Sequence, residues 1–499
     1  KCDFLEFNKN LDERATWYPG FCALDWQPTD PTQQHPQFPC QPVTQEEWAT
    51  AKNNGRLKMR VENFVLPAIK WMPKFVDTSL FKMMQIMTQF NLTPVCFKVY
   101  DRLAIPKAVP GTFRHIAIAT DMFAVHATII HNRLAEPLNR SCPSQIIAFL
   151  ANRSAMDGNA VRQSVREDCA QALAEGQDAE LLILLLDDVK MYDSMSAFTS
   201  AWSLKSLGAP ELMQQCFAEN QHLNSFHVLS TEGRTRLCLH HHGERQGDVK
   251  ACDSTSIFNM VRVKCLTGLG IMYRYSIVDP VTGKKEDRVG FYYVDDCEHH
   301  LRGEEAARVA VSILGKLSIL CQVAIHPDKS CLIHQTGGVP IDSLSLWAWS
   351  RELGEIQFIT IHRMGTAHVP RMLKSLGYAV TDAADRSSQQ DSIVLARLVP
   401  AVLVIEQRVL TFKEAIMLMQ ALIGGALGYD PLTCPISAKT LLRFGSRLRR
   451  ALGRAYGMLG NDQNFMPYVP ISLGGDSANY LLGEYTLYLF RELGHYLNA

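Results

Sequence analysis

The stretch Leu181-Leu-Ile-Leu-Leu-Leu-Asp187-Asp188 consists of six large aliphatic residues that run directly into two adjacent carboxylates. A second stretch, Phe291-Tyr-Tyr-Val-Asp295-Asp296, repeats this design with aromatic residues. Short apolar runs of this length are typical of fully buried β-strands. The sequence therefore predicts two buried strands, each ending in a pair of aspartates.

Paired aspartates at the end of a buried strand are electrostatically costly. Like charges repel each other, and burying them without compensation costs on the order of several kcal/mol. Divalent cations relieve this cost, and hard oxygen ligands favour Mg²⁺. Two such ions roughly 4 Å apart can activate a hydroxyl nucleophile and stabilise a leaving phosphate group. The plainer alternative is that each Asp-Asp pair only forms a turn or caps a helix.

The overall composition is that of an ordinary globular protein. The 499 residues are 47% hydrophobic and 20% charged, which suggests two or three packed units. Lys plus Arg and Asp plus Glu number 50 each, so net charge does not favour a polyanionic partner. The 14 cysteines include no C-x-x-C spacing, which argues against a zinc or redox motif and favours a reducing intracellular compartment. No apolar run reaches the roughly 18 residues that cross a membrane.

Residue patterns divide the chain into three parts. Residues 1–45 are rich in proline, glutamine and aromatic residues without periodicity, which indicates an extended arm. Residues 46–380 mix helical periodicity with short β-branched runs, including a hairpin predicted between Val95 and Ile118. Residues 381–499 carry helical periodicity. We therefore expect an α+β fold followed by a helical unit.

Three short motifs, in this order, carry a family resemblance. They are Asp187 to Asp193, Gly243-Glu-Arg-Gln246-Gly247-Asp248 followed by Ser254, and Tyr293-Val-Asp295-Asp296, which resemble motifs A, B and C of reverse transcriptases. The interval from Gln246 to Ser254 is three residues longer than in the usual motif B. The chain thus resembles reverse transcriptases of the non-LTR retrotransposon and group II intron type.

Further segments extend the resemblance from about residue 60 to about residue 480. Ile105-Pro-Lys107 and Phe113-Arg114-His-Ile116 are similar to the fingers pattern, His326-Pro-Asp-Lys329 to motif D, Leu373 to Tyr378 to motif E, and Tyr468 to Gly475 to a thumb element.

The resemblance implies a right-hand polymerase fold. Fingers and palm, with a small antiparallel sheet in the palm, would interleave over residues 46–380, and a helical thumb would follow over residues 381–499. The implied activity is RNA-directed DNA synthesis from an RNA template, a DNA primer and dNTPs, in the nucleus and without a membrane partner. Asp187, Asp295 and Asp296 would hold two Mg²⁺ ions, for which Mn²⁺ can substitute.

The resemblance also implies roles in nucleotide binding. Lys107 and Arg114 would hold the triphosphate, since charge-assisted contacts of this kind favour Lys and Arg. Tyr192 would occupy the steric-gate position, where a bulky ring clashes with a ribose 2′-hydroxyl. The alternatives are that Lys107 and Arg114 are solvated hairpin charges and that Tyr192 is a core aromatic.

Other motif residues have implied roles as well. Gln246 and Gly247 would let the backbone and an amide approach the template strand and the nascent pair. Lys329 would be the general acid for pyrophosphate departure, or alternatively a charge at the end of a helix. Asp188 and Asp193 are expected to be hydrogen-bonding supports rather than ligands.

Two further clusters invite a binding role. Arg447, Arg450 and Arg454 share a helical face and are candidates for contact with the primer–template backbone, with a solvated helix face as the alternative. The run His240-His-His242 invites a metal reading. Consecutive residues of a strand face opposite ways, however, which argues against a three-ligand site there.

Two rival functions remain open. The segment Ser254-Thr-Ser-Ile-Phe-Asn259 is also similar to motif B of viral RNA-dependent RNA polymerases, and Asp188 with Asp193 fits their motif A. Val294 replaces the glycine of their usual G-D-D, which argues against this reading. The other rival is a non-catalytic descendant that binds RNA or protein, and retention of all three motif aspartates argues against it.

Overall fold

The structure is a computed structural model that describes most of the chain up to residue 381. The described residues are 24–54, 72–106, 112–150, 153–221, 224–230, 233–240, 243–273, 275–278, 285–288, 290–375, 378–381, 391–396, 399–400, 402–403, 437 and 440. Lys107, Arg447, Arg450 and Arg454 lie outside them, as does most of the predicted thumb.

A four-stranded antiparallel sheet contains both of the predicted aspartate-bearing strands. Its strands are β3 (Glu180–Asp187), β9 (Gly290–Tyr293), β10 (Asp296–Leu301) and β11 (Cys331–Thr336), in the spatial order β11-β3-β10-β9. The two predicted strands, β3 and β9, are confirmed, and β10, which begins at Asp296, lies between them.

Helices on both faces of this sheet explain why β3 is apolar throughout. Leu182, Leu184 and Leu186 pack in a core with α10 (Val249–Thr267) and α11 (Gly303–Cys321). Leu181, Ile183 and Leu185 pack in a separate core that includes α6 (Ala155–Ala174). Because alternate side chains of a strand point to opposite faces, a strand covered on both sides needs an unbroken apolar run.

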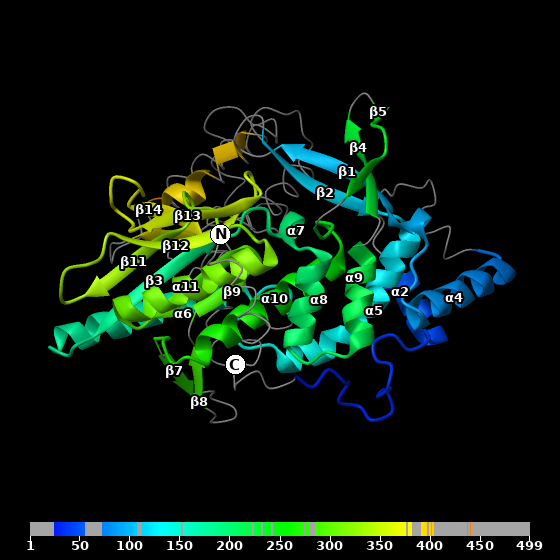
Figure 1. The fold of residues 1–499 in the computed structure, drawn as a ribbon, viewed down its shortest axis with the longest axis horizontal. Coiled ribbons are helices and arrows are strands. Elements are labelled where there is room, and N and C mark those ends of the chain that lie inside the picture. The colour runs from blue at the N-terminus through cyan, green and yellow to red at the C-terminus, as the bar shows by residue number, and fades with distance from the viewer. Residues whose placement is uncertain are drawn as a thin grey trace, which may run out of the picture.

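A second sheet lies apart from the first, at the upper right in Figure 1. It contains β1 (Val99–Pro106), β2 (Phe113–Ala119), β4 (Asn224–Ser230), β5 (Gly233–Arg234) and β6 (Cys238–His240), ordered β2-β1-β4-β5 with β6 also paired to β4. Strands β1 and β2 are antiparallel, which confirms the predicted hairpin, whereas β1 and β4 run parallel.

The remaining elements surround these two sheets. The helices are α2 (Gln45–Asn54), α4 (Lys74–Gln89), α5 (Asp121–Ser141), α7 (Met191–Ser194), α8 (Ala197–Ser206), α9 (Glu211–Gln221) and the 3₁₀ turn η1 (Val95–Lys98). The strand pairs are β7 (Tyr275–Val278) with β8 (Lys285–Arg288), β12 (Ser343–Ser350) with β13 (Glu355–His362), and β14 (Met372–Ser375) with β15 (Tyr378–Thr381). The fold is therefore mixed α and β, with several small sheets.

The described part of the N-terminal arm packs against the helices. The indole N–H of Trp26 donates to the carbonyl of Leu207, 3.2 Å away. The Arg133 guanidinium donates to the carbonyls of Pro39 and Gln41 at 2.6 and 2.8 Å. The arm is thus held by the Trp26 side chain and by its own backbone carbonyls, which the sequence pattern did not reveal. Among the described residues, no helix combines the length and apolar character needed to cross a membrane.

Candidate active site

The ends of β3 and β10 bring the two aspartate pairs together. Asp187, the last residue of β3, is the direct cross-strand partner of Asp296, the first residue of β10. The backbone N–H of Asp188 donates to the carbonyl of Asp295 at 3.2 Å. Two runs that are distant in the sequence therefore place four carboxylates at one edge of the sheet.

The two aspartates of the first pair, Asp187 and Asp188, differ in their surroundings. The Asp188 carboxylate is buried, and both of its oxygens accept from the Arg262 guanidinium of α10, at 2.6 and 2.9 Å. Such a two-pronged contact fixes both groups. Asp187 is only partly buried, and its backbone pairs with Asp296. This placement favours a supporting role for Asp188 and leaves Asp187 and Asp296 facing the candidate site.

The turn between β9 and β10 has an unusual backbone. Val294 has a φ of +61°, which is strained for a β-branched residue. The buried Asn259 amide of α10 donates to the Val294 carbonyl at 3.1 Å. Helix α10 therefore holds the turn that presents Asp295.

The protein raises the pKa of both aspartates of the second pair. Burial, with the neighbouring charges of Asp295 and Asp187, raises the pKa of Asp296 to about 7. Desolvation by the surrounding protein also raises the pKa of Asp295, although this residue remains exposed, and Asp187 adds to the rise. Arg114 of β2 acts in the opposite direction on the Asp295 pKa. The negative charge at this edge is thus only partly compensated.

Lys329 lies at the same edge. Its Nζ is 3.3 Å from Oδ2 of Asp187, and its side chain is 59% exposed. The segment around it is tied to the end of β3, because His326 N–H donates to the Asp187 carbonyl at 2.8 Å and Asp187 N–H donates to Ser330 Oγ at 3.1 Å. The segment from His326 to Ser330 therefore brings an ammonium group next to the Asp187 carboxylate.

Tyr192 follows on the single turn of α7. Its ring is half-buried against a cluster that includes Phe258 and Val294, and its hydroxyl is 3.9 Å from Sγ of Cys252 on α10. Burial raises the pKa of the Tyr192 hydroxyl, so the ring stays neutral. A partly exposed ring beside the turn of Asp295 is compatible with both predicted readings, the steric gate and the core aromatic.

Gln246 and Gly247 approach a protein strand closely. The Gln246 carbonyl accepts from the Ala117 N–H of β2 at 2.7 Å. Gly247 has a φ of +111°, and a Cβ placed on it would lie 2.9 Å from the Ala117 carbonyl oxygen. The close approach that glycine permits here is therefore to β2, whereas the resemblance implied an approach to the template and nascent pair.

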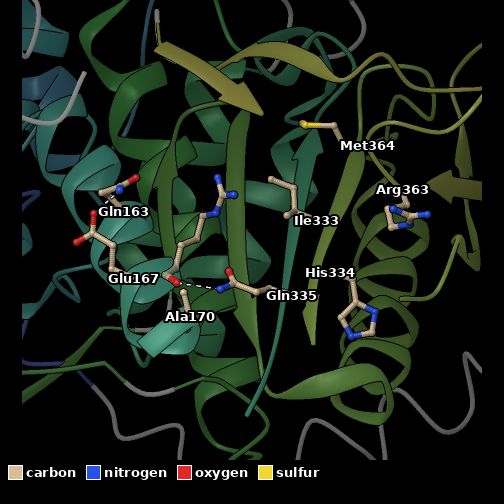
Figure 2. A pocket seen from close by; sticks show the side chains of 9 residues that line it. Gln163, Glu167, Ala170, Ile333, His334, Gln335, Arg363 and Met364 are labelled. Atoms are coloured by element: carbon tan, nitrogen blue, oxygen red, sulfur yellow. Dashed lines mark hydrogen bonds between the residues drawn. The ribbon is translucent and has the colours of Figure 1, made fainter. Parts of the chain in front are cut away.

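Two cavities lie near this sheet. A cavity of about 170 Å³ is lined by Asp187, Asp296, Lys329 and Ser375, so it opens directly on the acidic edge. A larger cavity of about 490 Å³ is lined by residues of α6 and β11, and on its α6 side Gln163 and Glu167 lie across from Ile333 and Gln335 (Figure 2). None of the site residues predicted from the sequence lines the larger cavity, so the smaller one is the relevant space.

The carboxylates are suited to a hard cation by their chemistry, but they are not gathered around one point. In the part of the chain that the structure describes, no three His, Cys, Asp or Glu side chains are grouped to hold a metal ion. The Lys329 ammonium instead contacts Asp187. The donor atoms fit Mg²⁺, and a metal-bound form would require these side chains to move closer together.

Two residues of the site were missed from the sequence. Arg262, which pairs with Asp188, stands three positions after Asn259 in α10, and a charged residue between Val261 and Val263 is the signal that could have found it. Glu244 is buried beneath the site and accepts hydrogen bonds from Ser254 and Gln221. Its position inside motif B was visible, but its burial was not.

Comparisons with known proteins give a sparse result. No protein-family model and no curated protein matches the chain. A solved structure of an apo telomerase from Candida Tropicalis, truncated from the C-terminal domain, is similar to this chain with a TM-score of 0.35 and 11% sequence identity. The match covers 54% of this chain and 57% of that telomerase chain. This chain thus spans little more than half of that telomerase chain.

Proposed function

We propose that this chain is a reverse transcriptase of the non-LTR retrotransposon kind, which adds dNTPs to the 3′ end of a DNA primer and uses RNA as the template. The observation that carries the proposal is the meeting of Asp187 and Asp296 as cross-strand partners, with Asp295 beside them. These are the aspartates of motifs A and C, and Lys329 of motif D contacts Asp187. Such convergence of separate motifs supports a shared catalytic role.

The position of these aspartates supports an assignment of the two sheets to parts of a polymerase. The sheet β11-β3-β10-β9 would be the palm, and the sheet of β1, β2 and β4 would belong to the fingers. The Gln246–Ala117 hydrogen bond ties motif B to β2. The thumb over residues 381–499 and the nuclear location are proposed from the resemblance alone.

The cofactor we propose is Mg²⁺, with Mn²⁺ as a substitute, held by Asp187, Asp295 and Asp296. When bound, the ions would supply charge neutralisation for the attacking hydroxyl and the leaving pyrophosphate. The partial compensation at this edge, with the pKa of Asp296 raised to about 7 by burial and neighbouring charges, supports such a cation site.

Other side chains of the protein would protonate the leaving group, contact the triphosphate and limit the space for the sugar. The exposed Lys329 ammonium would protonate the departing pyrophosphate. Arg114 of β2, which acts electrostatically on Asp295, would contact the triphosphate together with Lys107. Tyr192 would set the space available to the sugar, beside the turn that carries Asp295.

The placement of Asn259 and Asp193 weighs against the RNA polymerase alternative. The residues that would sense a ribose in that family correspond to Thr255 and Asn259, both of which are buried in α10. The Asn259 amide donates to the Val294 carbonyl, and the Asp193 carboxylate lies 3.4 Å from Arg102. These groups are therefore engaged with the protein, which supports a deoxynucleotide substrate.

The test is primer extension by the purified chain with Mg²⁺, an RNA template and a DNA primer, comparing dNTPs with NTPs. We expect extension with dNTPs only, and its loss in Asp295→Asn. Extension with NTPs would establish the RNA polymerase instead. A folded protein that extends with neither would be a non-catalytic descendant that binds RNA or protein.

A further inference from the structure

The segment 243–248, here called the B loop, rests directly on the turn that carries Tyr192. Gly243 has a φ of +98°, and a Cβ placed on it would lie 2.6 Å from both Cα and the carbonyl oxygen of Asp193. The Glu244 N–H donates to the Tyr192 carbonyl at 2.6 Å. The position of the Tyr192 backbone is therefore coupled to the position of the B loop.

The side chain of Glu244 anchors the B loop beneath the site. It is 6% exposed, and its Oε1 accepts hydrogen bonds from Ser254 Oγ at 2.6 Å, Gln221 Nε2 at 2.6 Å and Ser200 Oγ at 3.4 Å. These donors come from α10, α9 and α8 respectively. A buried carboxyl group with several donors is costly to disturb, because each donor loses its partner when the carboxyl group is removed.

The rest of the B loop is held as well, so Glu244 acts within a fixed frame. The Arg245 guanidinium lies 3.4 Å from the centroid of the Phe123 ring. The Gln246 carbonyl accepts from Ala117 N–H at 2.7 Å. Asp248 caps the start of α10 by accepting from Lys250 N–H at 3.1 Å. Loss of the Glu244 anchor would therefore loosen the end of the loop nearest Tyr192.

We propose that Glu244 is a positioning residue for nucleotide selection, which acts through Tyr192 and does not touch the nucleotide. This inference rests on the proposed function, in which the Tyr192 ring excludes a ribose 2′-hydroxyl. The Glu244 side chain fixes the B loop, the Glu244 N–H fixes the Tyr192 carbonyl, and the ring is thereby held at the sugar. A loosened loop lets the ring yield to the extra hydroxyl group.

The test compares kcat/KM for single dNTP and NTP additions on an RNA template with a DNA primer. We expect Glu244→Met, which removes the acceptor of all three donors, to lower the preference for dNTPs by about tenfold. The matched control is Glu219→Met on α9, whose carboxylate pairs with Lys98 at 2.6 Å. This control should leave the preference unchanged. Ser254→Ala, which removes one donor, should shift it in the same direction by less.

A double-mutant cycle shows whether Glu244 acts through Tyr192. In a Tyr192→Val background, Glu244→Met should cause no further change in preference. Full additivity of the two effects would overturn the inference, as would an unchanged preference in both Glu244→Met and Ser254→Ala while the wild type extends the primer. A wild-type protein that adds no nucleotide would instead overturn the proposed function, and the inference with it. Thermal unfolding of each variant checks folding, and Ser254→Ala carries the test if Glu244→Met does not fold.

Discussion

Asp296 and Glu298 lie two positions apart on β10 and face the same side of the sheet, yet the protein shifts their pKa values in opposite directions. Burial opposes the charge of Glu298, but the Arg162 guanidinium 2.7 Å away and His300 outweigh it and lower the Glu298 pKa to about 2. Burial and two neighbouring aspartates raise the Asp296 pKa to about 7. The Glu298 carboxylate is paired with the Arg162 guanidinium, whereas among the described residues the Asp296 carboxylate has no such cationic partner.

This difference indicates that Glu298 has a structural role and that Asp296 is suited to bind a cation. A buried carboxylate with its own guanidinium is satisfied and has no need of a ligand. A carboxylate beside like charges, such as Asp296, is stabilised when an external cation arrives. Asp296 therefore differs from Glu298 in having no guanidinium partner in the described part of the chain, and variants of the two residues can test this contrast.

The largest expected effect is the loss of nucleotide addition in Asp296→Asn. We expect the rate of primer extension to fall by about three orders of magnitude or more, because a ligand of the proposed ions is removed. Folding should be unaffected, since removing one of several like charges relieves repulsion. Single-turnover extension and thermal unfolding, run in parallel, measure the two effects. A variant that extends at the wild-type rate would show that Asp296 is not part of the site.

The next effect concerns stability and the other half of the contrast. Arg162→Met leaves Glu298 buried without its partner, and we expect the free energy of unfolding to fall by about 3–5 kcal/mol. Chemical denaturation measures this change. The matched double variant Arg162→Met with Glu298→Gln should recover part of the loss, because no uncompensated charge then remains. Equal stability of the single and double variants would mean that the ion pair is not what stabilises this region.

Lys329→Gln should give a smaller effect, and unlike Arg162→Met it should change the rate of nucleotide addition rather than the stability. We expect the rate of nucleotide addition to fall by about a hundredfold, as for loss of a general acid. The free energy of unfolding should change by less than about 1 kcal/mol, because an exposed ion pair contributes little. A pH–rate profile distinguishes the roles, since loss of a general acid removes the alkaline limb of the curve. An unchanged profile would assign Lys329 to charge neutralisation alone.

The smallest effect is a pH dependence of stability that arises from Glu298. Its folded pKa of about 2 lies below the unfolded value, so its contribution is full above about pH 4.5 and is lost as the pH falls towards 2. We expect unfolding free energy measured between pH 6 and pH 3 to decline less steeply in Glu298→Gln than in the wild type. Identical slopes would show that Glu298 does not titrate as described.

The elements that could be predicted are those whose signal is local. The run Leu181 to Leu186 is apolar at every position, which only a strand covered on both faces requires, and β3 has this arrangement. The hairpin of β1 and β2 was also predicted from short β-branched runs. Both predictions depend on neighbours in the sequence, and the structure confirms them.

What could not be predicted depends on partners that are far apart in the chain. Arg162 and Glu298 pair across 136 positions, and nothing around either residue indicates the other. Glu244 sits in a recognisable motif, but its burial is produced by three helices that meet around it. The positive φ of Val294 likewise depends on the Asn259 amide of a distant helix. Tertiary packing, and not local pattern, decides these features.

The most direct test of the difference between Asp296 and Glu298 is to measure Mn²⁺ binding to the full chain. Electron paramagnetic resonance detects the binding, and no nucleic acid is present. The wild type and Glu298→Gln should bind Mn²⁺ alike, because Glu298 is already neutralised by Arg162. Asp296→Asn should bind it at least about tenfold more weakly, because it loses a carboxylate ligand. Equal Mn²⁺ affinity in Asp296→Asn and the wild type would contradict the claim that the acidic edge of β3 and β10 is the cation site.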